Sequence, residues 1–300
     1  MSRWADSLMS SLDERASIVK TELGPIQVAR EGAGPSVLSI HGSPGGFDQG
    51  LIWAQHLRNG GCQLIAPSRP GYLRTPLDSG RKPSEQADLY ASMLDALHID
   101  KVTILGISSG GPSAVHFAAR HPNRTKALLL DAAVLLPISP ASSAIERAVF
   151  ESGVGVWLSC QVAKRWPRLT AASVVDALSA GLNKDRKRNA VEWITSSPAR
   201  LDCVVELPTS LAPRRFREPG QRNDESNEIN LDPLPFAKVT VPTLVAQGNN
   251  DAFPLIDHAT SAACKISDAE LMLVEEGHHG LPWCRHIDVV ARRQLELALA

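Results

Sequence analysis

The chain has 300 residues, of which 43% are hydrophobic, and its formal net charge at pH 7 is -1. Its length and apolar content are enough for one large α/β domain or two smaller ones. A near-neutral charge gives no long-range attraction to nucleic acid or to an anionic membrane, which argues against both as partners. No stretch reaches the ~18 apolar residues of a membrane-spanning helix, and the N-terminal residues lack the apolar run of a secretory signal.

The cysteines do not fit a disulfide framework. None of them forms a C-x-x-C pair, and an odd number leaves one without a partner. We therefore expect a reducing compartment and a cytoplasmic protein. The five cysteines are Cys62, Cys160, Cys203, Cys264 and Cys284.

The chain begins with a helical pattern and then alternates β-rich runs with helices. Trp4, Leu8, Met9 and Leu12 share one face of the first helix, which we expect to dock on the domain rather than on a membrane. Gly24-Pro25 separates the first two β-rich runs and indicates an antiparallel hairpin. The expected strands are residues 18–23, 26–30, 36–40, 62–66, 101–105, 126–130, 241–246 and 270–274. The expected later helices are residues 49–58, 83–97, 111–120 and 285–299.

Such alternation is typical of a mostly parallel sheet with helices on both sides. It breaks between residues 135 and 232, where a helical pattern with Trp157, Trp166 and Trp193 precedes a loop-rich stretch from 208 to 235. We therefore divide the chain into a core, residues 1–134 and 233–300, and a helical lid, residues 135–232. A lid inserted there would lie over the carboxyl ends of the strands, where ligands bind in open α/β sheets. Its tryptophans either line a substrate chamber or pack the lid onto the core.

The motif Gly106-Ile107-Ser108-Ser109-Gly110 joins an apolar strand to a helix and has the pattern of a nucleophile elbow. A serine at such a turn has a strained backbone, and glycine two residues to each side lets strand and helix pass closely. The turn lifts the hydroxyl above the sheet at the positive end of the following helix. Ser108 is therefore the candidate nucleophile.

Further motifs make the chain resemble the lidded esterase and lipase branch of the α/β-hydrolase fold. His41-Gly42-Ser43-Pro44-Gly45-Gly46 follows the third strand and is similar to that branch's oxyanion turn. Ser68-Arg69-Pro70-Gly71-Tyr72 resembles its D-x-x-G-x-G turn, with serine in place of the aspartate. The resemblance covers nearly the whole chain and diverges in the lid. It implies an α/β-hydrolase fold with an eight-stranded, mostly parallel sheet flanked by helices, and a helical lid after the sixth strand.

The resemblance also implies a triad in the chain order Ser, Asp, His. Asp251 ends a turn after the seventh strand that matches the family's G-x-x-D turn, so it is the candidate acid that orients the base. Two adjacent histidines follow the eighth strand. His278 follows a glycine, as the family's base usually does, whereas a gapless reading of the loop places the base at His279. We favour His279 and leave His278 open.

The chemistry implied is acyl transfer through an acyl-enzyme. Backbone N–H groups of Ser109 and Ser43 would hold the oxyanion, whereas Pro44 has no N–H to donate. No cofactor is needed. We expect no metal, because adjacent histidines diverge and no third ligand has suitable spacing.

These residues predict a serine hydrolase that cleaves a carboxylic ester of a small or medium acyl group. Three alternatives remain: a proline iminopeptidase, a C–C bond hydrolase or cofactor-free perhydrolase, and a non-catalytic receptor on the same fold. The iminopeptidases typically carry tryptophan after the nucleophile, where this chain has Ser109. The triad argues against a receptor. We expect a small-molecule ester as the ligand, and a homodimer remains open.

Overall fold

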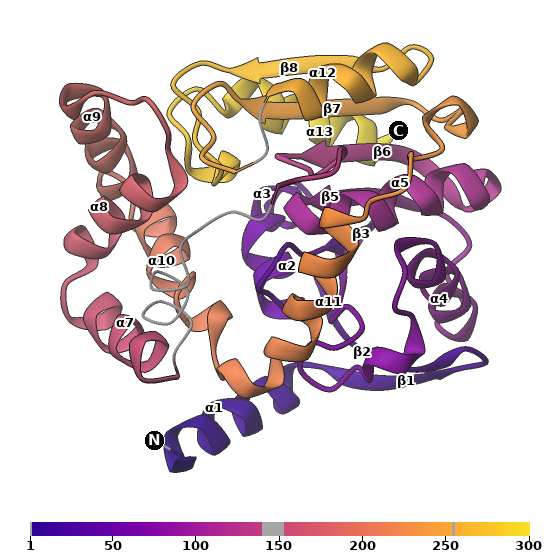
Figure 1. The fold of residues 1–300 in the computed structure, drawn as a ribbon, viewed down its shortest axis with the longest axis horizontal. Coiled ribbons are helices and arrows are strands. Elements are labelled where there is room, and N and C mark those ends of the chain that lie inside the picture. The colour runs from indigo at the N-terminus through magenta and orange to yellow at the C-terminus, as the bar shows by residue number, and fades with distance from the viewer. Residues whose placement is uncertain (1, 140–152, 254–255) are drawn as a thin grey trace.

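The computed structural model describes residues 2–139, 153–253 and 256–300, and an eight-stranded sheet forms its centre (Figure 1). The strands lie in the order β1-β2-β4-β3-β5-β6-β7-β8. β1 and β2 form an antiparallel hairpin, β2 is antiparallel to β4, and the other neighbouring pairs are parallel. The expected eight-stranded, mostly parallel sheet is thereby confirmed. The strands are β1 Ser17–Thr21, β2 Gly24–Glu31, β3 Ser36–Ile40, β4 Gln63–Pro67, β5 Val102–Ile107, β6 Thr125–Asp131, β7 Thr243–Gly248 and β8 Glu270–Val274.

Helices cover both faces of the sheet, and central strands such as β6 and β7 are buried on both sides as a result. Successive residues of β6 show this alternation: Leu129 packs into the cluster that contains α2, α3 and α13, and Leu128 and Leu130 pack against α4, α5 and α12. The helices of this core are α1 Ser2–Arg15, α2 Phe47–Trp53, α3 Gln55–Asn59, α4 Pro83–Ala96, α5 Gly111–Arg120, α12 Ile256–Lys265 and α13 Asp288–Leu299.

Two local expectations differ from the structure. The helix expected over residues 49–58 is two short helices, α2 and α3, which meet at Ala54 with a ψ of 11°. No glycine or proline marks this break in the sequence. In the hairpin, Gly24 pairs with Thr21 as the first residue of β2, so the turn lies at Glu22 and Leu23 rather than at Gly24-Pro25.

The chain between β6 and β7 forms a set of helices that we call the helical insertion. In Figure 1, α7 to α10 lie beside the sheet and α11 crosses in front of it. These described helices fall within residues 135–232. Their bounds are α7 Gly153–Arg165, α8 Pro167–Leu178, α9 Lys184–Thr195, α10 Pro198–Glu206 and α11 Glu218–Ile229.

Helix α11 corrects the loop-rich expectation for residues 208–235. Its buried residues are Gly220, Gln221, Asp224 and Glu228, which share one face at helical spacing. A hydrophobic pattern could not reveal a helix whose buried face is glycine and polar side chains. Pro219 is in the first turn, where proline is tolerated because the N–H has no intrahelical partner.

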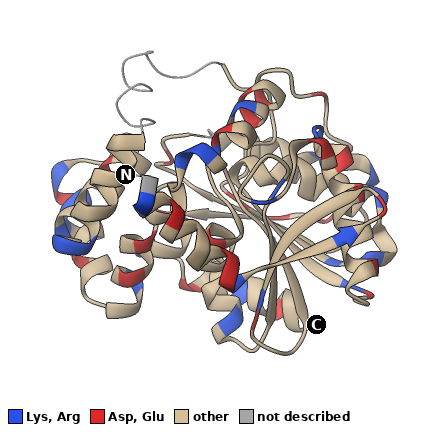
Figure 2. Ribbon diagram, turned by 90° about the horizontal axis from the view of Figure 1, so that it is seen from below, with Lys and Arg blue, Asp and Glu red and all other residues tan. Residues whose placement is uncertain are grey.

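Helix α1 packs against both the core and the helical insertion. Met9 and Leu12 are 2% and 4% exposed and belong to the main core cluster, whereas Trp4 and Leu8 pack against Val156 and two further residues of the insertion. The expected docking of this apolar face is confirmed. Across the described helices, none is long and apolar enough to span a membrane. Figure 2 shows basic and acidic residues mixed along the same helices.

The close approach of β5 to α5 generates a first prediction. A Cβ at Gly106 would lie 2.5 Å from the Cβ of Ala114, and the backbone of Gly111 is 3.2 Å away. Gly106→Ala should therefore lower the free energy of unfolding by about 1–3 kcal/mol, as overpacking does. The control is Gly153→Ala on α7, where a Cβ meets no atom within 4 Å. Equal free energies of unfolding in urea for both variants and the wild type would contradict the proposed steric overlap at Gly106.

Candidate active site

The candidate nucleophile Ser108 lies at the carboxyl end of β5 in a strained turn. Its φ is 49°, a left-handed value that is uncommon for a residue with a side chain. Its carbonyl accepts a hydrogen bond from the Val134 N–H at 3.0 Å, which helps to hold the turn. A Cβ at Gly110 would lie 2.5 Å from the carbonyl oxygen of Ile40. The turn therefore tolerates only glycine at position 110.

The loop after β3 passes directly against Ser108. A Cβ on Gly42 would lie 2.9 Å from the Cβ of Ser108. The Gly42 N–H donates to Gln49 Oε1 at 2.9 Å, and Gln49 Nε2 donates to the Pro44 carbonyl at 2.9 Å. Gln49, which lies on the helix after the loop, therefore holds the loop at Gly42 and at Pro44, close to Ser108.

His41 also holds the loop after β3 in place through hydrogen bonds. Its ring is fully buried, and burial together with the charge of Arg69 holds its pKa well below the usual value. The Arg69 N–H donates to His41 Nε2 at 2.9 Å, so the neutral ring carries its proton on Nδ1. That Nδ1–H donates to the Gly42 carbonyl at 2.7 Å.

The candidate acid and base are in direct contact. His279 Nδ1 lies 2.9 Å from Asp251 Oδ2 and 3.1 Å from Oδ1, at the carboxyl edge of β7 and β8. The carboxylate of Asp251 also accepts from Gln247 Nε2 at 3.0 Å and from the Phe253 N–H at 2.8 Å. These contacts orient both groups. Ser108 lies on the same edge of the sheet, after β5.

His278 has different surroundings. Its ring is fully buried, its Nδ1 accepts from the Gly280 N–H at 3.1 Å, and its Nε2 has no partner among the described residues. Burial lowers its pKa to about 4, with a smaller contribution from His279. Of the two adjacent histidines, the structure therefore brings His279 to Asp251, in line with the preference from the sequence.

The helical insertion is hydrogen-bonded to the loop that carries Asp251 and to the loop that carries His279. The Leu178 carbonyl at the end of α8 accepts from the His279 N–H at 2.9 Å and from the Ala252 N–H at 3.3 Å. The Ala180 N–H donates to the Asn250 carbonyl at 2.8 Å, and Ser179 forms a β-bridge with Asp251. The acid and base loops thus share a backbone anchor outside the core.

The sequence did not predict a role for Asp131, a further buried carboxylate at the end of β6. It accepts from Trp53 Nε1 at 3.1 Å and from Gln294 Nε2 at 2.6 Å. The Trp53 ring also contacts His279, with centroids 6.1 Å apart, and Asp131 pairs in register with Ile107 beside the nucleophile. The sequence did contain one signal for this role, an aspartate at the carboxyl end of a buried strand.

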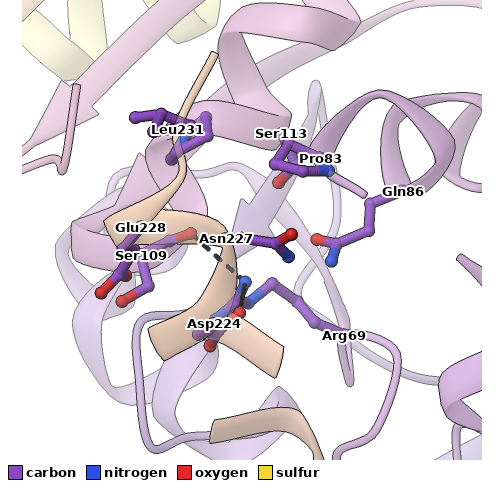
Figure 3. Close-up of a pocket in the computed structure, with 10 residues that line it drawn as sticks. Arg69, Pro83, Gln86, Ser109, Ser113, Asp224, Asn227, Glu228 and Leu231 are labelled. Atoms are coloured by element: carbon purple, nitrogen blue, oxygen red, sulfur yellow. Dashed lines mark hydrogen bonds and ion pairs between the residues drawn. The ribbon is translucent and has the colours of Figure 1, made fainter. Parts of the chain in front are cut away.

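A role for Arg69 was not predicted from the sequence, although this residue lies in a motif that resembles a family turn. Arg69 is 1% exposed and pairs with Asp224 of α11 at 2.9 Å. Figure 3 shows this pair beside Ser109 and Glu228. These four residues help to line a small cavity of about 10 Å³. No signal in the sequence connected Asp224 with this turn, because its helix has a polar buried face.

Two tryptophans of the insertion, Trp166 and Trp193, each lie against an arginine. Trp166 is 54% exposed and has the Arg165 guanidinium over its ring. Trp193 stacks under the Arg200 guanidinium at 3.8 Å. Trp166 therefore neither lines a chamber nor packs the insertion onto the core. In the part of the chain that the structure describes, no three His, Cys, Asp or Glu side chains form a group that could hold a metal ion.

Comparisons with known proteins identify the fold. The family model described as the alpha/beta hydrolase fold matches residues 35–154. A solved alpha/beta hydrolase fold protein from Nakamurella multipartita is 34% identical, covers 95% of this chain and 99% of its own, and superimposes with a TM-score of 0.89.

Two curated proteins illustrate the sequence relatives. The uncharacterized hydrolase YcgS of Bacillus subtilis is 31% identical over 123 residues, which are 41% of this chain and 43% of that protein. A 2-hydroxy-6-oxononadienedioate/2-hydroxy-6-oxononatrienedioate hydrolase of Cupriavidus pinatubonensis is 28% identical over 264 residues, which are 84% of this chain and 83% of that protein.

The buried carboxylate of Asp131 generates a prediction on pH. Burial raises its pKa from 3.8 to about 6, despite its two hydrogen bonds. Because the folded protein binds this proton more tightly than the unfolded chain does, its free energy of unfolding falls as the pH rises from 3.8 to about 6. Asp131→Asn should therefore remove a fall of roughly 3 kcal/mol in the free energy of unfolding between pH 4 and pH 7. Urea titrations at several pH values measure it, with the exposed Asp100→Asn as control; an unchanged pH slope in Asp131→Asn would refute it.

Proposed function

Because the chain belongs to the α/β-hydrolase fold family, we propose that it is a serine hydrolase with Ser108 as nucleophile, His279 as general base and Asp251 as the acid that orients the base. One observation carries this proposal. The hydrogen bond of 2.9 Å between His279 and Asp251 forms on the sheet edge where Ser108 lies in a strained turn. A carboxylate that accepts from Nδ1–H leaves Nε2 with a lone pair for a proton.

The proposed reaction has two halves. His279 Nε2 takes the proton of Ser108 as its oxygen adds to a carbonyl carbon, and backbone N–H groups of Ser43 and Ser109 hold the oxyanion. The bond to the leaving group then breaks, and His279 returns the proton to that group. Water, activated by the same histidine, hydrolyses the acyl-enzyme.

For the bond that breaks, we favour a C–C bond over the ester expected from the sequence. The relative from Cupriavidus pinatubonensis, which aligns with most of this chain, is named as a hydrolase of 2-hydroxy-6-oxo-dienedioates. In such a substrate, the 2-hydroxyl proton first moves to C5, which converts the enol to a 2-oxo group. Serine then adds to the 6-oxo carbon, and the electrons of the C5–C6 bond pass through the neighbouring double bond to the 2-oxo oxygen, which takes up a proton. Addition of water then yields a carboxylic acid and a shorter hydroxydienoate. A carboxylic ester is the second candidate, because the same residues and oxyanion donors suit it.

The surroundings of the site enter the proposal as well. We infer that the helical insertion, residues 135–232, covers the site as a lid, since α8 is bonded to the acid and base loops. All five cysteines are free in the structure, which supports a reducing, cytoplasmic setting.

A direct comparison of substrates tests the bond that breaks. We expect kcat/KM for a 2-hydroxy-6-oxo-dienedioate, followed by loss of its visible absorbance, to exceed that for p-nitrophenyl butyrate by roughly tenfold or more. Prolyl p-nitroanilide tests the iminopeptidase alternative, and Ser108→Ala gives the background. Faster turnover of the nitrophenyl ester would instead support the esterase.

Variants of the three proposed residues test the mechanism. Ser108→Ala and His279→Ala should each lower kcat by roughly 10³-fold or more, and the double variant should be little worse, because residues acting as one unit are not additive. Asp251→Asn should cost roughly 10²–10⁴-fold.

His278→Ala supplies the matched control and should cost only roughly tenfold, as expected for a supporting residue. Thermal melting of each variant separates lost chemistry from lost folding. A severe loss in His278→Ala beside a mild one in His279→Ala would reverse the assignment, and full activity in both would refute the serine-hydrolase mechanism.

A further inference from the structure

We propose that Arg69, held by Asp224 of α11, is a positioning residue that sets both backbone donors of the oxyanion. The inference rests on the proposed function, because it concerns the N–H groups of Ser43 and Ser109. It assigns a task to the buried ion pair between the helical insertion and the core.

The guanidinium of Arg69 contacts the two donor segments at once. Its Nη1 donates to the Ser109 carbonyl at 3.2 Å, and its Nη2 makes a longer hydrogen bond of 3.5 Å to the Gly42 carbonyl. The same two nitrogens pair with both carboxylate oxygens of Asp224. The cation therefore lies between the elbow and the oxyanion loop, and its position is set by α11.

A second contact reaches Ser43 through its side chain. The hydroxyl of Tyr72 donates to Asp224, and it lies 2.9 Å from the Ser43 hydroxyl. One turn along α11, Glu228 lies with Ser109 around the same small cavity. Burial raises the pKa of Glu228 to about 7, with a further contribution from the nearby Asp224. Ser43 is thus linked to α11 through its side chain and Tyr72, and Ser109 is linked to α11 through its carbonyl and Arg69.

The Gly42 carbonyl and the Ser43 N–H belong to one peptide unit. Hydrogen bonds in a chain polarise one another, so a carbonyl that accepts from donors makes the N–H of its own peptide a stronger donor. The Gly42 carbonyl accepts from His41 Nδ1 at 2.7 Å in addition to Arg69. Arg69 also fixes His41, since its N–H donates to Nε2. It therefore both orients and polarises the proposed donor.

Burial of this pair needs a reason other than stability. The side chains of Arg69 and Asp224 are 2% and 5% exposed, and desolvation of such a pair often cancels its attraction. The contact is nevertheless built tightly: a Cβ on Gly220 would lie 2.3 Å from the Tyr72 ring, and the Gly220 N–H donates to the Gly71 carbonyl at 2.9 Å. Helix α11 is thereby seated on the turn that carries Arg69.

The experiment measures how fast a fluorophosphonate labels Ser108, because that reaction also places an oxyanion in the hole. Asp224→Asn keeps the shape but removes the charge that holds Arg69, and should label roughly 10- to 100-fold more slowly. With the better of the two substrates, kcat should fall by a similar factor while KM changes less than roughly threefold. Glu225→Gln is the matched control, with the same loss of charge one residue along α11, and should label at the wild-type rate.

Labelling of Asp224→Asn within threefold of wild type, in protein that still melts cooperatively, would overturn the inference, as would an equal loss in Glu225→Gln. Where Asp224→Asn does not fold, Tyr72→Phe takes its place, since it removes only the hydroxyl between Asp224 and Ser43. It should label roughly three- to tenfold more slowly, and an unchanged rate would overturn the inference. A wild-type protein that is neither labelled nor active would refute the proposed function instead.

Discussion

The site depends on how closely three backbone segments approach one another at the carboxyl edge of the sheet. Gly106 lets β5 pass α5, Gly110 lets the turn pass β3, and Gly42 lets the next loop reach Ser108. A Cβ at each of these positions would lie 2.5–2.9 Å from an atom of the neighbouring segment, so the segments would have to move apart. The positive φ of Ser108 is retained because the packed strand and helix on either side leave its backbone no other path.

The helical insertion contributes to this edge at two separate places. The end of α8 supplies a carbonyl that binds the backbone of the base and of the acid loop, and α11 supplies Asp224 to the turn after β4. The core alone would leave these hydrogen-bonding groups without their partners. In this protein the insertion is therefore part of the scaffold of the candidate site.

The sequence predicted the sheet because its strands are apolar runs between clear turn residues, and β3, α5 and β8 have the expected bounds. It predicted the contact between Asp251 and His279 because the loop motifs and their spacing are specific. It could not predict α11, whose buried face is polar, or the break at Ala54, which no glycine or proline marks. Partners such as Asp224 and Arg69 are 155 residues apart, and only folding brings them together.

Helix α1 adds a constraint of its own. It is the first element of the chain, yet its apolar face is shared between the core cluster and the insertion, and its Asp6 forms an ion pair with Arg215 in the insertion. An inserted segment that is attached to the core only at its first and last residues can rotate as a unit about the line that joins these two residues. The insertion has further attachments, at α1, at the end of α8 and at α11, so such a swing would break all three. Local rearrangement of side chains and loops would leave these attachments in place, whereas rotation of the whole insertion would not.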